Sequence, residues 1–258
     1  MNPLSHNRKA WNKQAKSGCR WSQPVDSATI EAAKNGHWSV ILTPNKTVPE
    51  DWFDDIRGKR VLCLASAGGQ QAPILAAAGA HVTSFDNSDG QLAQDRLVAD
   101  RDGLDIKTIQ GDMADLSALD DGSFDFIFHP VSNVFCENIL PVWKESFRVL
   151  TKGGRLLSGF MNPLFFLFDH EEAEKTGRLE VQYTLPFSDL KSLSKEKLER
   201  ILKEEHALEF GHSLEDQIGG QIQAGFAIQG LYEDYWDNKA TPLNNFSPMY
   251  ISTLGVKL

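Results

Sequence analysis

The sequence predicts an α/β protein: a seven-stranded, mostly parallel sheet with helices on both faces and an antiparallel last strand. Two observations carry this prediction. Short apolar runs alternate with helical patterns from residue 58 onwards, as in a parallel sheet built from βαβ units. The stretch 58–86 also reads as buried strand, tight turn, helix and second buried strand, with the carboxylate of Asp86 at the end of that strand.

Composition limits the classes of function. A chain of 258 residues suits one α/β domain with insertions. Its net charge of -9 and its dispersed Lys and Arg residues speak against a nucleic-acid partner. Cys19, Cys63 and Cys136 lack metal-ligand spacing, so we expect reduced thiols, no metal site and a cytoplasmic location. No apolar run is long enough to cross a bilayer, so we expect no membrane partner.

We expect one domain, 1–258, in four parts. A helical cap, 1–57, precedes a ligand-binding half, 58–161, an insertion, 162–212, and a final helix and strands, 213–258. The predicted strands are 61–65, 81–85, 106–109, 123–128, 155–161, 226–232 and 250–257. The predicted helices of the cap and the sheet are 5–15, 26–35, 71–78, 88–101, 137–150 and 213–225.

The insertion breaks this rhythm. Residues 164–168 form an apolar cluster, and an acidic run, 169–174, follows it. Residues 181–186 have the pattern of a strand, and 194–204 that of a helix that begins at a serine.

The turn after the first strand points to a ribose-containing ligand. A dinucleotide site would show G-x-G-x-x-G there, whereas this chain has small residues and adjacent glycines, ASAGGQQ at 65–71. Such a turn lets a ligand lie against the backbone, and Asp86 can accept both hydroxyls of a ribose. Each feature alone also has ordinary structural explanations.

Together with later segments, this turn resembles a known family. VLCLASAGG at 61–69 looks like the first motif of the class I S-adenosylmethionine-dependent methyltransferases, which have a Rossmann-like fold. Further segments match in order: GDM at 111–113, SFDFIFH at 123–129, RVLTKGGRL at 148–156 and AGFAI at 224–228. The resemblance covers about 58–160 and 212–258, and it implies S-adenosylmethionine as cofactor and S-adenosylhomocysteine as product.

The resemblance also implies a set of cofactor-binding residues. Asp86 would bind the ribose, Asp112 the adenine amine and Met113 the adenine ring, although Met113 could equally fill the core. The full set that it implies is Ala65, Ser66, Ala67, Gly69, Gln70, Asp86, Asn87, Asp112, Met113 and His129.

Two departures from the family concern the turn. Cys63 stands where the family has an acid that organises the site around the methionine amino group, and Ala65 and Ala67 stand where it has glycines. Alanine at these positions leads us to expect negative φ angles there.

The resemblance suggests where methyl transfer would occur. His129, after the fourth strand, and His212, before the last helix, are candidates for a general base. Each has a structural alternative, since His129 could offer only its backbone carbonyl and His212 could be a helix-capping neighbour. Trp11, Trp21 and Phe165 are candidate walls for a small-molecule acceptor, with simple packing as the alternative.

Two other functions compete with methyl transfer to a small molecule. One is a protein that binds S-adenosylmethionine or S-adenosylhomocysteine without transfer, as the residues at 63, 65 and 67 suggest. The other is an NAD-dependent oxidoreductase, against which the missing G-x-G-x-x-G argues. Oligomeric state leaves no signal in the sequence.

Overall fold

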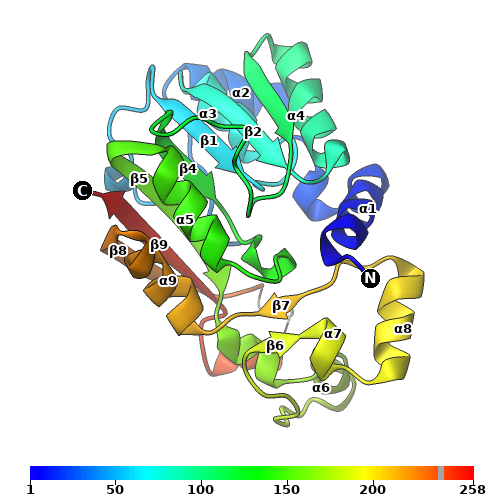
Figure 1. The fold of residues 1–258 in the computed structure, drawn as a ribbon. Coiled ribbons are helices and arrows are strands. Elements are labelled where there is room, and N and C mark those ends of the chain that lie inside the picture. Colours follow the sequence, from blue (N-terminus) through cyan, green and yellow to red (C-terminus); the bar gives the residue numbers. More distant parts are fainter. Residues whose placement is uncertain (238–240) are drawn as a thin grey trace.

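A seven-stranded sheet forms the centre of the computed structural model, which describes residues 1–237 and 241–258 (Figure 1). Its order is β3-β2-β1-β4-β5-β9-β8, and only β9 runs antiparallel to its neighbours, as predicted. The strands are β1 Arg60–Leu64, β2 His81–Asp86, β3 Ile106–Gln110, β4 Phe124–His129, β5 Leu150–Met161, β8 Phe226–Asp234 and β9 Tyr250–Lys257.

Helices cover both faces of the sheet, because successive residues of a strand point to opposite sides. In β1, Val61 and Cys63 join a core with one group of helices, whereas Leu62 and Leu64 join a core that includes Trp143. The first face carries α2 Ser27–Lys34, α3 Gln71–Ala77 and α4 Asp89–Asp102; the second carries α5 Leu140–Val149 and α9 Gly220–Ala224, which follows a π-helical turn, η5 Glu215–Gly219. The helices predicted around the sheet are therefore present.

The N-terminal segment begins with two helices, as predicted, each with a side-chain cap. In α1, Pro3–Ser17, Asn2 accepts from the Ser5 N–H; at α2, Asp26 accepts from the Thr29 N–H at 2.8 Å. The two helices differ in position, since α2 packs on α3 while α1 packs on α4. In Figure 1, α1 lies beyond the end of the sheet, next to the helix α8, Lys195–Glu204.

The insertion differs from its prediction in two ways. The strand expected at 181–186 is wrong: only Val181 forms a single bridge, to Phe168, because no neighbouring strand lies alongside to pair with the rest. The acidic run forms a helix, α6 His170–Thr176, which Asp169 caps. The predicted helix at 194–204 is present as α8, with Ser194 as its N-cap.

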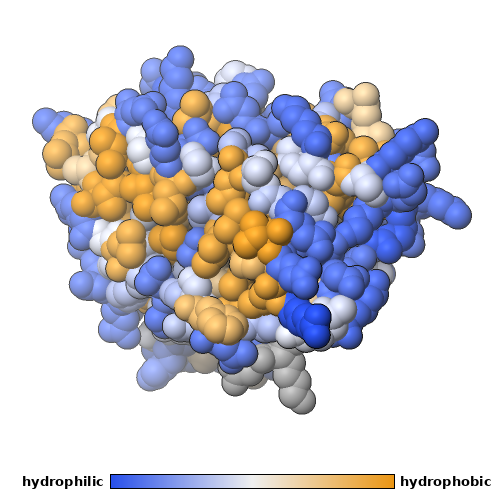
Figure 2. Space-filling view, turned by 90° about the horizontal axis from the view of Figure 1, so that it is seen from below, coloured by the Kyte–Doolittle hydropathy of each residue, from blue (hydrophilic) through white to orange (hydrophobic). Residues whose placement is uncertain are grey.

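The rest of the insertion is a small layer below the main sheet. Two short strands pair antiparallel, and the segment that contains the apolar cluster is a 3₁₀ helix. These elements are η4 Pro163–Leu167, β6 Phe187–Ser188, α7 Asp189–Ser192 and β7 Phe210–Gly211. Figure 2 views the molecule from this end and shows hydrophobic patches bordered by hydrophilic side chains. The remaining 3₁₀ segments are η1 Arg20–Ser22, η2 Glu50–Trp52, η3 Asn133–Phe135 and η6 Pro242–Asn245.

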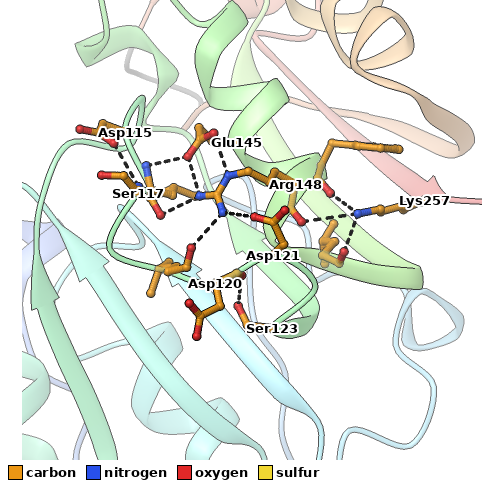
Figure 3. Close-up of polar contacts among 12 residues, drawn as sticks. Asp115, Ser117, Asp120, Asp121, Ser123, Glu145, Arg148 and Lys257 are labelled. Atoms are coloured by element: carbon orange, nitrogen blue, oxygen red, sulfur yellow. Dashed lines mark hydrogen bonds and ion pairs between the residues drawn. The ribbon is translucent and has the colours of Figure 1, made fainter.

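At the end of the sheet where β4 and β5 begin, two basic side chains, Arg148 and Lys257, make several hydrogen bonds and ion pairs (Figure 3). Arg148 pairs with Glu145 at 2.7 Å and Asp121 at 2.6 Å, and also donates to two backbone carbonyls of the loop 116–119. Lys257 donates to the carbonyls at the end of α5, where a cation is stabilising. Both basic side chains bind groups of the chain itself, so we assign this cluster a structural role.

Among the described residues, no helix combines the length and the apolar character that crossing a membrane requires.

Candidate functional site

A cavity of about 850 Å³ lies at the carboxyl ends of the parallel strands. Its lining follows the edge of the sheet in the order of the strands: Asp86 at the end of β2, Ala65–Ala67 after β1, Pro130–Ser132 after β4, Met161 at the end of β5 and Tyr250 at the start of β9. Ligands of open α/β sheets bind in the crevice outside these ends. The cavity therefore occupies the position that the sequence predicted.

The turn after β1 has left-handed backbone at two alanines. Ala65 has φ 46° and Ala67 has φ 66°, close to the φ of 73° at Gly69. The expectation of negative φ at these alanines is wrong. An alanine in this conformation costs about 1–2 kcal/mol, and such strain persists only where surrounding contacts impose it. The turn thus keeps the left-handed backbone expected of glycine at two positions that carry alanine.

A buried carboxylate, Asp95 on α4, holds this turn from below. Its Oδ1 accepts from the Gly69 N–H at 2.7 Å, and its Oδ2 accepts from the Ser84 hydroxyl at 2.6 Å. Burial raises the pKa of Asp95 to about 6, against the effect of these two hydrogen bonds. At the position of the family's acid, burial raises the pKa of the Cys63 thiol. The carboxylate beneath the turn therefore comes from α4 instead of β1.

The N-terminal segment covers the same turn from above. The Gly68 N–H donates to the Trp21 carbonyl at 3.3 Å, and the Val25 N–H donates to the Gly69 carbonyl at 2.8 Å. The side-chain amide of Gln70 donates to two further carbonyls of this segment. Gln70 was predicted to contact the cofactor, but its amide nitrogen already donates hydrogen bonds to the N-terminal segment.

Two polar oxygens beside the turn lack a partner in the cavity wall. Ser66 Oγ and Gln91 Oε1 are buried, and neither makes a hydrogen bond to a nitrogen or oxygen of the described residues; Ser66 interacts with the Cys63 thiol. Gln91 donates from its amide nitrogen to Ser22 Oγ at 2.8 Å. A Cβ on Gly68 would come within 2.6 Å of Gln91 Oε1, so glycine is required there.

Asp86 stands at the other side of the turn. Its carboxylate opens onto the cavity, and protein surrounds it closely enough that burial raises its pKa to about 7. The Ser88 N–H donates to it at 2.7 Å, which partly offsets that shift. Asn87 also lines the cavity, but its amide is bound to α1, where it accepts from Arg8 and donates to the Leu4 carbonyl, both at 2.9 Å.

Asp112 and Met113, which the resemblance implied for the adenine, also line the cavity. One oxygen of Asp112 accepts from the Ala114 N–H at 3.0 Å, and this contact orients the carboxylate. Phe85 packs edge-on against Gly111, where a Cβ would lie within 2.2 Å of the ring. The segment after β3 is therefore held against the end of β2 by close packing.

Neither candidate histidine lines the cavity. The His129 ring is fully buried, with Nδ1 2.8 Å from the Leu64 carbonyl and Nε2 2.5 Å from Asn133 Oδ1. His212 donates from Nε2 to the carbonyls of Asn133 and Cys136, at 3.2 and 2.9 Å. Burial lowers the pKa of both rings. This geometry gives no support to a general base at either position, and because no part of His129 lines the cavity it gives none to a cofactor contact by the His129 carbonyl.

Of the three residues predicted as walls for the acceptor, two line the cavity and one does not. Trp11 and Trp21 line the cavity, and Trp11 packs edge-on against Phe135 with ring centres 4.9 Å apart. Phe165 does not line it; its ring stacks on His170 at 3.7 Å within the insertion.

Sequence reasoning missed several lining residues, namely Gln91, Glu209, Trp236 and Tyr250. Gln91 lies in an ordinary helical pattern, and the other three lie outside the segments that match the family's cofactor motifs. Only the strand order offered a signal, because the start of an antiparallel last strand lies beside the end of the fifth strand.

The chain is similar to known methyltransferases. A family model described as "Methyltransferase domain" matches residues 62–158. A protein of Bacillus subtilis (strain 168), described as "Uncharacterized methyltransferase YbaJ", is 53% identical over 259 residues, the full length of both chains. The "Sterol 24-C-methyltransferase erg-4" of Neurospora crassa is 34% identical over 138 residues, which are 53% of this chain and 34% of that protein.

Solved structures share the fold at low identity. An S-adenosylmethionine-dependent methyltransferase from Mesorhizobium loti superposes with a TM-score of 0.61 at 18% identity, over 80% of this chain and 94% of that one. One from Methanosarcina mazei gives a TM-score of 0.56 at 16% identity, over 81% and 96%. These likenesses confirm the predicted Rossmann-like fold.

Proposed function

Because this chain belongs to the class I S-adenosylmethionine-dependent methyltransferases, we propose that it transfers a methyl group to a small molecule bound in the cavity beside Met161 and Tyr250. One observation carries the proposal: a single cavity continues from Asp86 to Tyr250, past the ends of four strands. Its volume of about 850 Å³ lies in the upper part of the range for small-molecule pockets, about 300–1,000 Å³. Such a cavity has room for two ligands.

The cover over the cavity supports a small acceptor. Asn7 of α1, itself buried, donates to the carbonyls of Phe135 and Leu208 and accepts from the Leu208 N–H at 2.7 Å. Nearby, His6 lies 2.8 Å from the His206 carbonyl. These contacts join α1 to the insertion above the cavity, and such a cover limits access by a macromolecule and excludes water.

The residues at the Asp86 end fit S-adenosylmethionine. The Asp86 carboxylate has one protein donor and can accept from the two hydroxyls of a ribose. Met113 and Asp112 would hold the adenine. The oxygens of Ser66 and Gln91 make no hydrogen bond to a nitrogen or oxygen of the described residues, and both suit the methionine ammonium group. They would replace the contact expected from an acid at position 63.

The reaction needs alignment more than covalent help. The bound sulfonium supplies an already activated methyl group. The chain would place the acceptor in line with it, between Pro130 and Tyr250, and exclude water. Neither His129 nor His212 acts as a base in this proposal, because neither residue lines the cavity and both rings are hydrogen-bonded within the protein. The unpaired cysteines are the basis on which we place the activity in the cytoplasm.

Calorimetry with S-adenosylhomocysteine tests the cofactor site. We expect binding, and we expect Asp86→Ala to weaken it by about 1–3 kcal/mol, the scale of charged hydrogen bonds. Asp89→Ala, at an exposed carboxylate three residues away, is the matched control. Absence of binding to the wild-type protein would refute the proposal, as would equal affinity in Asp86→Ala.

A second experiment separates transfer from mere binding. Metabolite extracts incubated with the protein and methyl-labelled S-adenosylmethionine should yield a labelled small molecule. Binding without any labelled product would favour the alternative of a cofactor-binding protein. The family membership leaves no support for the NAD-dependent alternative.

A further inference from the structure

The acceptor end of the cavity contains a carboxylate that the proposed reaction has not used. Glu209 precedes β7 and lines the cavity together with Tyr250 at the start of β9. Tyr250 pairs with Met161 at the end of β5, so this region lies on the far side of β1 and β4 from Asp86. Glu209 therefore faces the space for the acceptor and lies away from the ribose end.

The backbone of Glu209 is fixed, whereas its carboxylate is left without a partner. Its N–H donates to Asp189 Oδ2 at 2.8 Å, and its carbonyl accepts from the Asp189 N–H at 3.1 Å. Among residues 1–237 and 241–258, no group makes a hydrogen bond or ion pair with the carboxylate itself. Burial and the charge of Asp189 raise the pKa of Glu209 to about 7. A ligand that supplies a hydrogen-bond donor or a positive charge would stabilise the ionised Glu209 carboxylate.

The charged side chains that line the rest of the cavity are also acidic. Among the described residues, four carboxylates line the cavity, those of Asp86, Asp112, Glu137 and Glu209, and no Lys or Arg does so. The pKa of the Tyr250 hydroxyl is raised, chiefly by burial and next by the negative charge of Glu209. An acceptor with a carboxylate or phosphate would meet four carboxylates along this lining, and the positive charge that acts on Tyr250 is that of Arg20, which is itself paired with Asp237.

Aromatic rings line the same cavity as this carboxylate. Trp236 and Tyr250 lie with ring centres 5.5 Å apart, and the Trp11–Phe135 pair lines the same cavity. Aromatic faces attract cations and also cover apolar groups. A carboxylate among such rings is a combination suited to an amine attached to an apolar body.

We propose that the methyl acceptor is a small molecule with an amino group and an apolar body, and that the Glu209 carboxylate pairs with that amino group. Glu209 then determines specificity for the acceptor, because its carboxylate attracts a cation and repels an anion at the same place. This inference rests on the proposed function, since it assigns the acceptor of that same cavity.

A charge series of matched probes tests the inference on the protein saturated with S-adenosylhomocysteine. The probes are phenethylamine, 2-phenylethanol and 3-phenylpropionate, which are cationic, neutral and anionic at about pH 8. Calorimetry and tryptophan fluorescence should rank phenethylamine first and 3-phenylpropionate last. In Glu209→Gln, phenethylamine should lose about tenfold or more in affinity, the scale of a charge-assisted hydrogen bond, and 2-phenylethanol should change little.

Two controls make the outcome specific. Glu137→Gln removes the same charge from an exposed position of the same cavity and should lower phenethylamine affinity much less. Retained binding of S-adenosylhomocysteine shows that Glu209→Gln is folded. The wild-type ranking needs no variant, so the inference remains testable even if that substitution prevents folding.

Several outcomes would overturn the inference. These are no binding of any probe to the wild-type complex, a preference for the neutral or anionic probe, and equal losses in Glu209→Gln and Glu137→Gln. Failure of the wild-type protein to bind S-adenosylhomocysteine would instead refute the proposed function, so the two failures are distinguishable.

Discussion

The carboxylate of Asp95 accepts a hydrogen bond from the Gly69 N–H at 2.7 Å, and this contact joins α4 to the turn after β1. The same carboxylate accepts from Ser84 on β2, so one buried group ties the turn, a helix and a strand together. Cys63, in the position of the family's acid, contributes only a buried thiol. The turn is thus supported by a carboxylate of α4, and its backbone has left-handed φ angles at Ala65, Ala67 and Gly69.

Asp95→Ala should destabilise the protein and weaken cofactor binding. It leaves the Gly69 N–H and the Ser84 hydroxyl buried without an acceptor, which costs about 1–3 kcal/mol for each unsatisfied group. Urea unfolding measures the stability, and calorimetry measures the affinity for S-adenosylhomocysteine. Asp100→Ala, at an exposed aspartate of the same helix, should change neither. Equal stability of the two variants would show that Asp95 does not support the turn.

Cofactor affinity should depend on pH through Asp86, whose pKa is raised to about 7 in the ligand-free protein. Ribose hydroxyls donate to the ionised carboxylate, so protonation removes acceptors. Affinity for S-adenosylhomocysteine should therefore fall as pH decreases from about 8 to about 6. In Asp86→Asn the affinity should be lower at pH 8 and should vary less over this window. An identical pH profile in the variant would assign the dependence to another group.

Ala67→Gly should leave the protein equally stable or make it more stable, unlike most substitutions by glycine. At φ 66° the change removes about 1–2 kcal/mol of backbone strain. It also adds about 0.4–1 kcal/mol of unfolded-state entropy, so the net gain is smaller. Ala76→Gly, within α3, should instead lose about 1 kcal/mol. Thermal unfolding of the two variants decides the matter, and a comparable loss in both would contradict the strain at Ala67.

His129→Ala should lower stability, because the ring bridges the Leu64 carbonyl and Asn133 inside the protein. We expect a loss of about 2–4 kcal/mol, which combines the cavity with the lost hydrogen bonds. Burial lowers the pKa of the folded His129, so the unfolded chain binds a proton first as pH falls. The stabilisation by His129 is therefore present above pH 6.5 and declines below it. Urea unfolding at about pH 7.5 and about pH 5.5 should show a smaller loss at the lower pH. Unchanged stability in His129→Ala would contradict the structural role that we assign to this ring.

The sequence by itself determined the seven-stranded sheet, its antiparallel last strand and the turn over which a ligand was expected, whereas the order of the strands came from the structure. Apolar runs such as 61–64 report burial on both faces, and the position of Asp86 at a strand end follows from local pattern alone. Asp112 and Met113 were expected only through the resemblance to the family, and both line the cavity.

Only the tertiary structure decided the rest. Asp95 and Gln91 approach the turn from α4, and Glu209 approaches Tyr250 from an insertion far away in the sequence. The inward rotation of His129 likewise depends on Asn133 and the Leu64 carbonyl, beyond what its place after β4 indicates. Local patterns specify burial and secondary structure, because those depend on neighbouring residues. Which polar group meets which across the cavity depends on long-range packing, which a single sequence does not display.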